Sequence, residues 1–336
     1  MASAFPTAAE TPRHKAMARR ASSGLAAIYW KEIGDHVSGY RFLILFALVI
    51  AAGLASLYVG GQTLRDTLTA AGETDRFVFL RLFTTGSASL PPFVFFVGFL
   101  APLLGIALGF DAVNGERNRG TLSRLVSQPI HRDAIINGKF LAGLTVIGAM
   151  IFLLGFIVGG LGLQMIGVAP TLEELARLGA YWGITVIYVG FWLSLAILFS
   201  TVLRHTVASA LASLAVWLFF TLFAGLLFGL IADAVAPVTD AFDAQQVLRH
   251  SQWVSALNRV SPSSLYDEAV QTVLNPHLRT LGPFTLDQVV GAIPGPLPLG
   301  QSLLLVWPHL TALVAATIVC FFLAYVVFMR QEIRPW

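Results

Sequence analysis

Six apolar runs, each about as long as a bilayer is thick, constrain the fold of this 336-residue chain more than any other feature. A helix needs about 20 apolar residues to cross the hydrocarbon core. Its backbone bonds must also be satisfied within the segment, because lipid offers no hydrogen-bond partners. The runs are Phe42–Gly61, Leu90–Phe110, Phe140–Val168, Ala180–Leu203, Thr206–Ala232 and Leu303–Met329. With 56% apolar and only 12% charged residues, the chain is predicted to be an all-α, polytopic membrane protein with six transmembrane helices.

The distribution of basic residues predicts how these spans are oriented. An even number of spans places both ends of the chain on the same side. Fourteen of the 21 Lys and Arg residues fall on that side and seven on the other. Because short basic loops remain in the cytoplasm, the N- and C-termini are predicted to be cytoplasmic.

The segments outside the spans divide the chain further. Residues 1–41 form a cytoplasmic arm with an interfacial helix, residues 42–232 hold spans one to five, residues 233–302 form an extracytoplasmic helical cap, and residues 303–336 hold span six and a tail. Ser22 or Ser23 would cap the first helix, which runs to about Val37 and is expected to lie flat at the membrane surface as an elbow. The alternative is a solvated linker helix.

Two helices are expected in the cap. One runs from Asp240 to about Asn258, and the other begins at a capping pattern at Ser264 and ends at Asn275. The second has an apolar face made of Leu265, Tyr266, Ala269, Val270, Val273 and Leu274. A third short helix is expected between Arg76 and Thr84.

A polar hairpin between spans two and three, residues 111–139, carries the densest charge. Five Lys or Arg residues stand there against three acids. Gly120-Thr121-Leu122 opens a short helical stretch that ends near Ser127, before Pro129, because proline cannot continue a helix. The hairpin is therefore predicted to be a small knob that docks onto a soluble partner.

The residues of this hairpin resemble a motif of the ABC-2 type transporter permeases, which are the membrane subunits of ATP-driven exporters. The matching residues are Glu116, Arg117, Gly120, Thr121, Leu122, Pro129, Arg132, Gly138 and Lys139. The chain as a whole is most similar to the branch associated with copper-enzyme maturation and gliding motility. The resemblance implies a bacterial or archaeal inner-membrane protein that pairs with a second permease copy and binds two ABC ATPase subunits. No nucleic-acid partner is expected.

The same resemblance implies an ATPase-coupling interface. Its residues are Glu116, Arg117, Gly120, Thr121, Leu122, Arg124, Leu125, Pro129, Arg132 and Arg204. Arg204 lies in the tight turn between spans four and five, where a smaller second contact would fall, or it is an ordinary snorkelling arginine. Glu116 either pairs with the flanking Arg117 and Arg119 or bonds with the ATPase, directly or by orienting the hairpin.

Other sources of chemistry are missing from the sequence. The six runs contain no Asp, Glu, Lys or Arg, which proton-coupled transport needs, and His309 is their one imidazole. Gly138-Lys139 is followed by Phe140, so no P-loop is formed and ATP must be bound by a separate subunit. Met and the single Cys320 are scattered, which argues against a metal site, and no catalytic Ser/His arrangement is present. We therefore expect a non-catalytic subunit without a cofactor of its own.

The favoured function is the transmembrane subunit of an ABC-2 type transporter. It would couple ATP hydrolysis by a separate ATPase to export, or to force on an extracytoplasmic partner. The alternative is a membrane-bound receptor or scaffold that holds a soluble protein without ATP-driven transport. An ATPase gene next to this one would favour the first.

The topology can be tested by labelling. With Cys320 replaced by Ala, a cysteine placed at Thr280 should react with an impermeant maleimide in intact cells, because the cap is predicted to face outward. A cysteine at Ser127 should not react. The reverse labelling pattern would contradict the topology with both ends inside.

Overall fold

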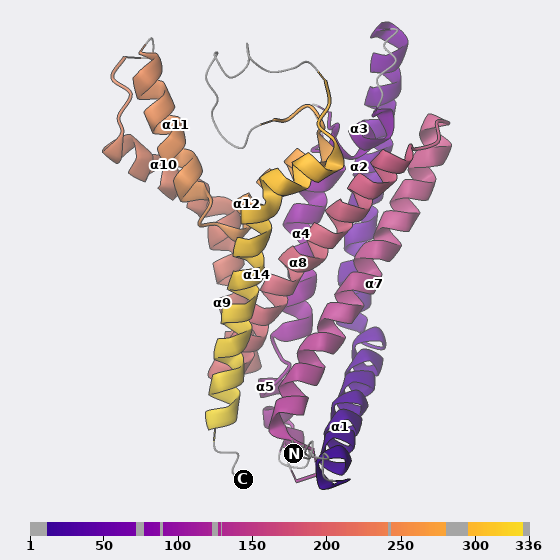
Figure 1. Cartoon of the computed structure of the whole chain (residues 1–336), viewed down its shortest axis with the longest axis vertical. Helices are drawn as coiled ribbons and strands as arrows, with labels where there is room; N and C mark the ends of the chain where they lie inside the picture. Colours follow the sequence, from indigo (N-terminus) through magenta and orange to yellow (C-terminus); the bar gives the residue numbers. More distant parts are fainter. Residues whose placement is uncertain are drawn as a thin grey trace, which may run out of the picture.

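The computed structural model describes residues 12–71, 77–87, 90–122, 127–128, 130–240, 243–279 and 295–331, without the side chains of 12–23, 41–42 and 66–71. The regular elements in these ranges are all helices (Figure 1). They are α1 (Pro12–Val37), α2 (Tyr40–Ala71), α3 (Val78–Thr84), α4 (Phe93–Gly109), α5 (Asn114–Asn118), α7 (Arg132–Ile166), α8 (Leu172–Val202), α9 (Thr206–Leu218), the π-helix η1 (Phe219–Phe223), α10 (Ala224–Val235), α11 (Ala244–Asn258), α12 (Pro262–Leu274) and α14 (Leu299–Arg330).

The six predicted spans are confirmed. Within the described residues, six helical stretches are long and apolar enough to cross a membrane, and each overlaps one apolar run. The fifth is not a uniform α-helix, because η1 interrupts it between α9 and α10. Beyond η1, α10 and α11 diverge from the bundle (Figure 1). The central span is α8, which is the most buried of the six, while the fifth and sixth are among the most exposed.

Two spans begin earlier than their apolar runs. α7 starts at Arg132 and α8 at Leu172, each about two turns before the predicted residue. Thr171 and Glu174 form a capping box at the start of α8, in which each side chain accepts the other residue's backbone N–H. Hydropathy marks only the apolar part of a helix, so it misses a first turn whose polar side chains have partners in the protein.

The N-terminal helix is longer than predicted and packs on the bundle. α1 lies lengthwise beside the first half of α7 (Figure 1). Close contacts join Gly24 to Ile130 and Gly138 to Ile28, and the Tyr29 hydroxyl donates to Thr145 at 3.1 Å. The expectation that this segment lies flat at the surface is therefore not confirmed.

The segment predicted as an external cap sends a helix in among the spans. α12 begins at the cap residue Ser261 rather than at Ser264, with Pro262 in its first turn. Every residue of its predicted apolar face is buried. Tyr266 stacks on Tyr188, near the middle of α8, with ring centroids 4.2 Å apart, and its hydroxyl lies 3.1 Å from Thr185 Oγ1. α12 is thus part of the transmembrane packing.

A buried arginine fixes the end of the bundle where α8 begins, which we call the outer end after the predicted topology. Arg177, which the sequence placed in a loop, lies in α8 and is fully buried. Its guanidinium donates to the carbonyl of Val273 at 2.8 Å, to the Ser302 hydroxyl at 3.2 Å, and to the carbonyl of Leu297. It therefore ties α8 to the end of α12 and the start of α14.

Ionisable groups also reach the spans through α12. Glu268 Oε2 lies 2.7 Å from His309 Nε2 of α14. A Cβ at Gly98 of α4 would lie 3.4 Å from an oxygen of Asp267. The apolar runs lack Asp, Glu, Lys and Arg, but a helix packed against the spans carries such residues. The lack of charged residues in the apolar runs therefore does not exclude proton-coupled transport, although the sequence alone pointed to that exclusion.

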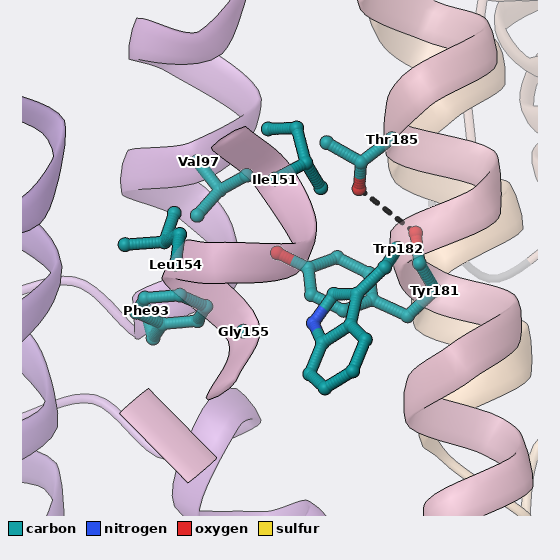
Figure 2. A pocket seen from close by; sticks show the side chains of 8 residues that line it. All are labelled: Phe93, Val97, Ile151, Leu154, Gly155, Tyr181, Trp182 and Thr185. Carbon is teal, nitrogen blue, oxygen red and sulfur yellow. Dashed lines mark hydrogen bonds between the residues drawn. The ribbon is translucent and has the colours of Figure 1, made fainter. Parts of the chain in front are cut away.

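Packing between α4, α7 and α8 is close. Figure 2 shows the narrow pocket between them, lined by Phe93, Val97, Ile151, Leu154, Gly155, Tyr181, Trp182 and Thr185. Thr185 Oγ1 donates to the carbonyl of Tyr181 at 2.8 Å. The pocket has no room for a water-sized sphere. It is a packing seam in which the Trp182 indole lies against Gly155.

Substitution of this glycine should destabilise the bundle. A Cβ at Gly155 would lie 2.2 Å from the Trp182 ring, so Gly155→Ala should lower the melting temperature of the purified protein. Gly159, one turn along the same helix, is the matched control, because a Cβ there meets nothing within 4 Å. Gly159→Ala should be neutral or stabilising by up to about 1 kcal/mol. Equal melting of the two variants would contradict the packing described.

Candidate functional site

The predicted coupling hairpin, which includes α5, lies at the end of the bundle where α14 ends and α1 lies (Figure 1). α4 ends at Gly109, and α5 follows after a short turn. The first backbone N–H groups of a helix have no partner within it. Here the Ser200 hydroxyl of α8 accepts from the N–H groups of Val113 and Asn114, at 2.9 and 3.2 Å. α5 is therefore fixed to the C-terminal end of α8, which we call the inner end after the predicted topology.

Four charged side chains, three buried and one half-exposed, form an ion cluster beside α5. Lys139 Nζ lies 2.8 Å from Glu32 Oε1 and 2.9 Å from Glu116 Oε1. Lys31 Nζ completes the cluster at 2.9 Å from Glu32 Oε1 and 3.2 Å from Glu116 Oε1. Glu32, Glu116 and Lys139 are only 6%, 4% and 4% exposed. The cluster, Lys31–Glu32–Glu116–Lys139, thus joins α1, α5 and α7 at one point.

The local sequence explains how these charges meet. Gly138 has no side chain, and a Cβ there would lie 2.8 Å from Ile28. This close approach brings α1 onto α7 and allows Glu32, one turn after Ile28, to reach Lys139. The glycine and lysine that end the hairpin motif therefore act together: the glycine admits the helix and the lysine binds its carboxylate.

The ion cluster also shifts the pKa values of Glu32 and Lys31. Burial would raise the pKa of the Glu32 carboxyl, but the ammonium groups of Lys139 and Lys31 outweigh burial and hold that pKa below its usual range. Burial opposes the charge on Lys31 as well, yet Glu32 and Glu116 raise its pKa above the usual range. A carboxyl with a depressed folded pKa stabilises the protein above its unfolded pKa, and this contribution is lost as the pH falls through the folded value.

The arginines beside Glu116 have other partners. Arg119 donates from Nε to the carbonyl of Gly115 at 3.2 Å, and Arg117 donates to the side chain of Gln331. In the described residues, neither arginine forms an ion pair with Glu116. Glu116 therefore does not pair with its flanking arginines, which was one of the two alternatives. It forms ion pairs with Lys31 and Lys139 instead. Glu116 is thus buried within the chain and bonded to α1 and α7.

The remaining predicted residues separate into two groups. Gly120 and Thr121 are exposed at the tip, where Gly120 makes the turn with a positive φ of 68°, and Arg204 is exposed in the separate turn between α8 and α9. Leu122 is buried, and Arg117 and Arg132 are half-buried. Arg124, Leu125 and Pro129 lie outside the described residues, as does most of the helix expected from Leu122 to Ser127. The buried and half-buried residues, Leu122, Arg117 and Arg132, therefore anchor the hairpin. The exposed residues, Gly120, Thr121 and Arg204, are available to a partner.

Sequence reasoning missed Glu32 and Gln331. Glu32 lies four residues after Ile28, on the apolar face of α1, where an acid needs a partner of opposite charge. The position of Glu32 on this face could therefore have indicated, from the sequence alone, a buried ion pair. Gln331 follows the last span and offers no comparable pattern.

Comparison with known proteins gives a consistent result. The profile of a family described as ABC-2 family transporter protein matches residues 26–333. A probable ABC transporter permease protein NosY of Pseudomonas aeruginosa is 28% identical over 239 residues, which cover 70% of this chain and 77% of that protein. A protein of the same description from Stutzerimonas stutzeri is 27% identical over 245 residues, with the same coverage of both chains. The resemblance seen in the hairpin motif is confirmed.

The ion cluster can be tested with a double-mutant cycle. Lys139→Met leaves the two buried carboxylates with the half-exposed Lys31 as their one shared cation and should destabilise the protein by about 3–5 kcal/mol. Adding Glu116→Gln removes one of those carboxylates and should recover part of this loss. The measurement is thermal unfolding of the purified protein in detergent. Arg119→Gln serves as the exposed control and should change stability by no more than about 0.5 kcal/mol. Additive effects of the two substitutions would show that the cluster is not energetically coupled.

Proposed function

The chain belongs to the ABC-2 family of transporter proteins and is a transmembrane permease subunit, and from this premise we propose that it couples ATP hydrolysis by a separate ABC ATPase to movement of its spans. The observation that carries this proposal is the arrangement at the hairpin. An exposed tip at Gly120 and Thr121 stands on a base that is bonded to α1, α7 and α8. A force applied to the tip by a bound ATPase would reach three helices without passing through a flexible segment.

The role of Lys139 supports a separate ATP-binding subunit. A phosphate-binding lysine must be free to reach the nucleotide. The Lys139 ammonium is instead buried between Glu32 and Glu116, at 2.8 and 2.9 Å. The Gly-Lys pair of this chain thus serves the internal ion cluster, and ATP would be bound by the partner.

Coupling in this proposal begins at the ion cluster. Glu116 is the only member carried by α5, so a displacement of the hairpin would be felt by Lys139 on α7 and by Lys31 on α1. Ser200 would pass the same displacement to α8. Because α8 is the central span, its motion would alter the packing of the neighbouring spans.

A second permease copy and two ATPase subunits would complete the transporter. The seam between α4, α7 and α8 is too narrow for a water-sized sphere, so it offers no passage for cargo within one copy. A path formed between two copies is consistent with that packing. The ends of the chain would be cytoplasmic, in a bacterial or archaeal inner membrane, and the output would be export or force on an extracytoplasmic partner.

The alternative is a scaffold that holds a soluble protein without using ATP. It shares the exposed tip and differs in its energetics. A scaffold would bind its partner equally well with ADP and ATP, and it would not change the partner's hydrolysis rate. The experiment below separates the two.

Gly120 and Gly167 offer a matched pair of variants. Both have a positive φ, 68° and 73°, and a Cβ at either would meet nothing within 4 Å. Valine should strain both turns to a similar degree, by about 1–2 kcal/mol. Gly120→Val should lower co-purification of the cognate ABC ATPase and its hydrolysis rate in the reconstituted complex, because Gly120 shapes the tip. Gly167→Val, at the opposite end of α7, should leave both unchanged.

Two results would contradict the proposal. Normal ATPase binding and hydrolysis in Gly120→Val would mean that the tip is not the coupling surface. If the wild-type permease binds the ATPase but neither alters its hydrolysis rate nor responds to nucleotide, the scaffold function would be favoured.

A further inference from the structure

Gln331, the residue that follows α14, is bonded to three separate elements. Its Oε1 accepts from Arg117 of α5, and its backbone carbonyl accepts from Arg132 Nη1 of α7 at 3.2 Å. Its Nε2 donates to the carbonyl of Thr201 in α8 at 2.6 Å. A carboxamide can accept and donate at once, and both capacities are used here.

The two arginines that reach Gln331 both belong to the hairpin motif. Arg117 lies next to Glu116, and Arg132 opens α7. The guanidinium of Arg132 also meets the carboxyl end of α14, where the helix dipole favours a positive charge. These motif arginines therefore connect the hairpin to the last span.

The other end of α14 is bonded to the same neighbour. The Ser302 hydroxyl accepts from Arg177 of α8 at 3.2 Å, and His309 meets Glu268 of α12 at 2.7 Å. α8 and α14 are thus joined at the inner end through Gln331 and Thr201 and at the outer end through Ser302 and Arg177. Two helices fixed at both ends move together.

We propose that Gln331 is a positioning residue that transmits displacement of the coupling hairpin to α14, so that α8 and α14 move as one unit. This inference rests on the proposed function, because it needs an ATPase that moves the hairpin. It adds a second route out of the hairpin, separate from the ion cluster. It also assigns Arg117 and Arg132 to the permease interior instead of the ATPase surface.

The test is a distance measurement across the outer end of the bundle. Spin labels replace Leu304 of α14 and Leu163 of α7, which are 76% and 42% exposed, in a Cys320→Ala background. The permease is reconstituted with its ATPase, and unlabelled permease is added in excess so that most complexes carry one labelled copy. Electron–electron double resonance then compares the distance distribution with ADP and with ATP plus vanadate.

The wild-type complex should show a nucleotide-dependent shift in this distance. Gln331→Ala should reduce the shift to less than half while ATPase co-purification stays at the wild-type level. Gln331→Glu keeps an acceptor for Arg117 but loses the donor to Thr201, so it should restore part of the shift, which a general loss of folding would not allow.

The outcomes distinguish the two proposals. A full shift in Gln331→Ala would overturn the role of Gln331 and leave the proposed function intact. Loss of ATPase binding in Gln331→Ala would also overturn it, because the residue would then act in docking. A wild-type complex that binds the ATPase but shows no shift would overturn the coupling function and this inference with it.

Discussion

The ion pairs of Lys139 with Glu32 and Glu116 set the geometry on which the inner half of the molecule depends. Removing these charges from water is costly, and only close partners of opposite sign offset the cost. The four members carry two positive and two negative charges, so the cluster is neutral as a whole. Its requirement for close contact holds α1 on α7 and holds the hairpin on both.

Polar contacts of this kind are found at both ends of the bundle, with mostly apolar packing between them. Arg177 joins α8, α12 and α14 at the outer end, and Gln331 joins α5, α7, α8 and α14 at the inner end. α8 takes part in both sets and lies at the centre of the packing. Helices in lipid gain little from the hydrophobic effect between them. Directional bonds at the ends therefore determine which helices stay together.

The spans could be predicted from the sequence, because lipid demands a long apolar helix wherever the chain crosses it. The same reasoning failed where a charge has a partner inside the protein. Lys139 and Arg177 lie inside helices but outside the apolar runs, and hydropathy assigns such residues to loops. Tyr266 was correctly placed on an apolar face, yet nothing in the sequence indicated that its neighbour would be Tyr188 in the middle of a span. The motif located the hairpin, while the pairing of its Lys139 with Glu32, 107 residues earlier in the chain, emerged only from the fold.

These long separations also impose an order on synthesis and assembly. Translation proceeds at about 5–20 residues per second. Lys139 follows Glu32 by 107 residues, so the carboxylate waits about 5–20 s for its cation at that rate. Gln331 follows Arg117 by 214 residues, and its bonds can form only after the last span is made. The inner end is therefore closed last, which leaves the spans free to reach their final positions before the bonds at Gln331 hold them there.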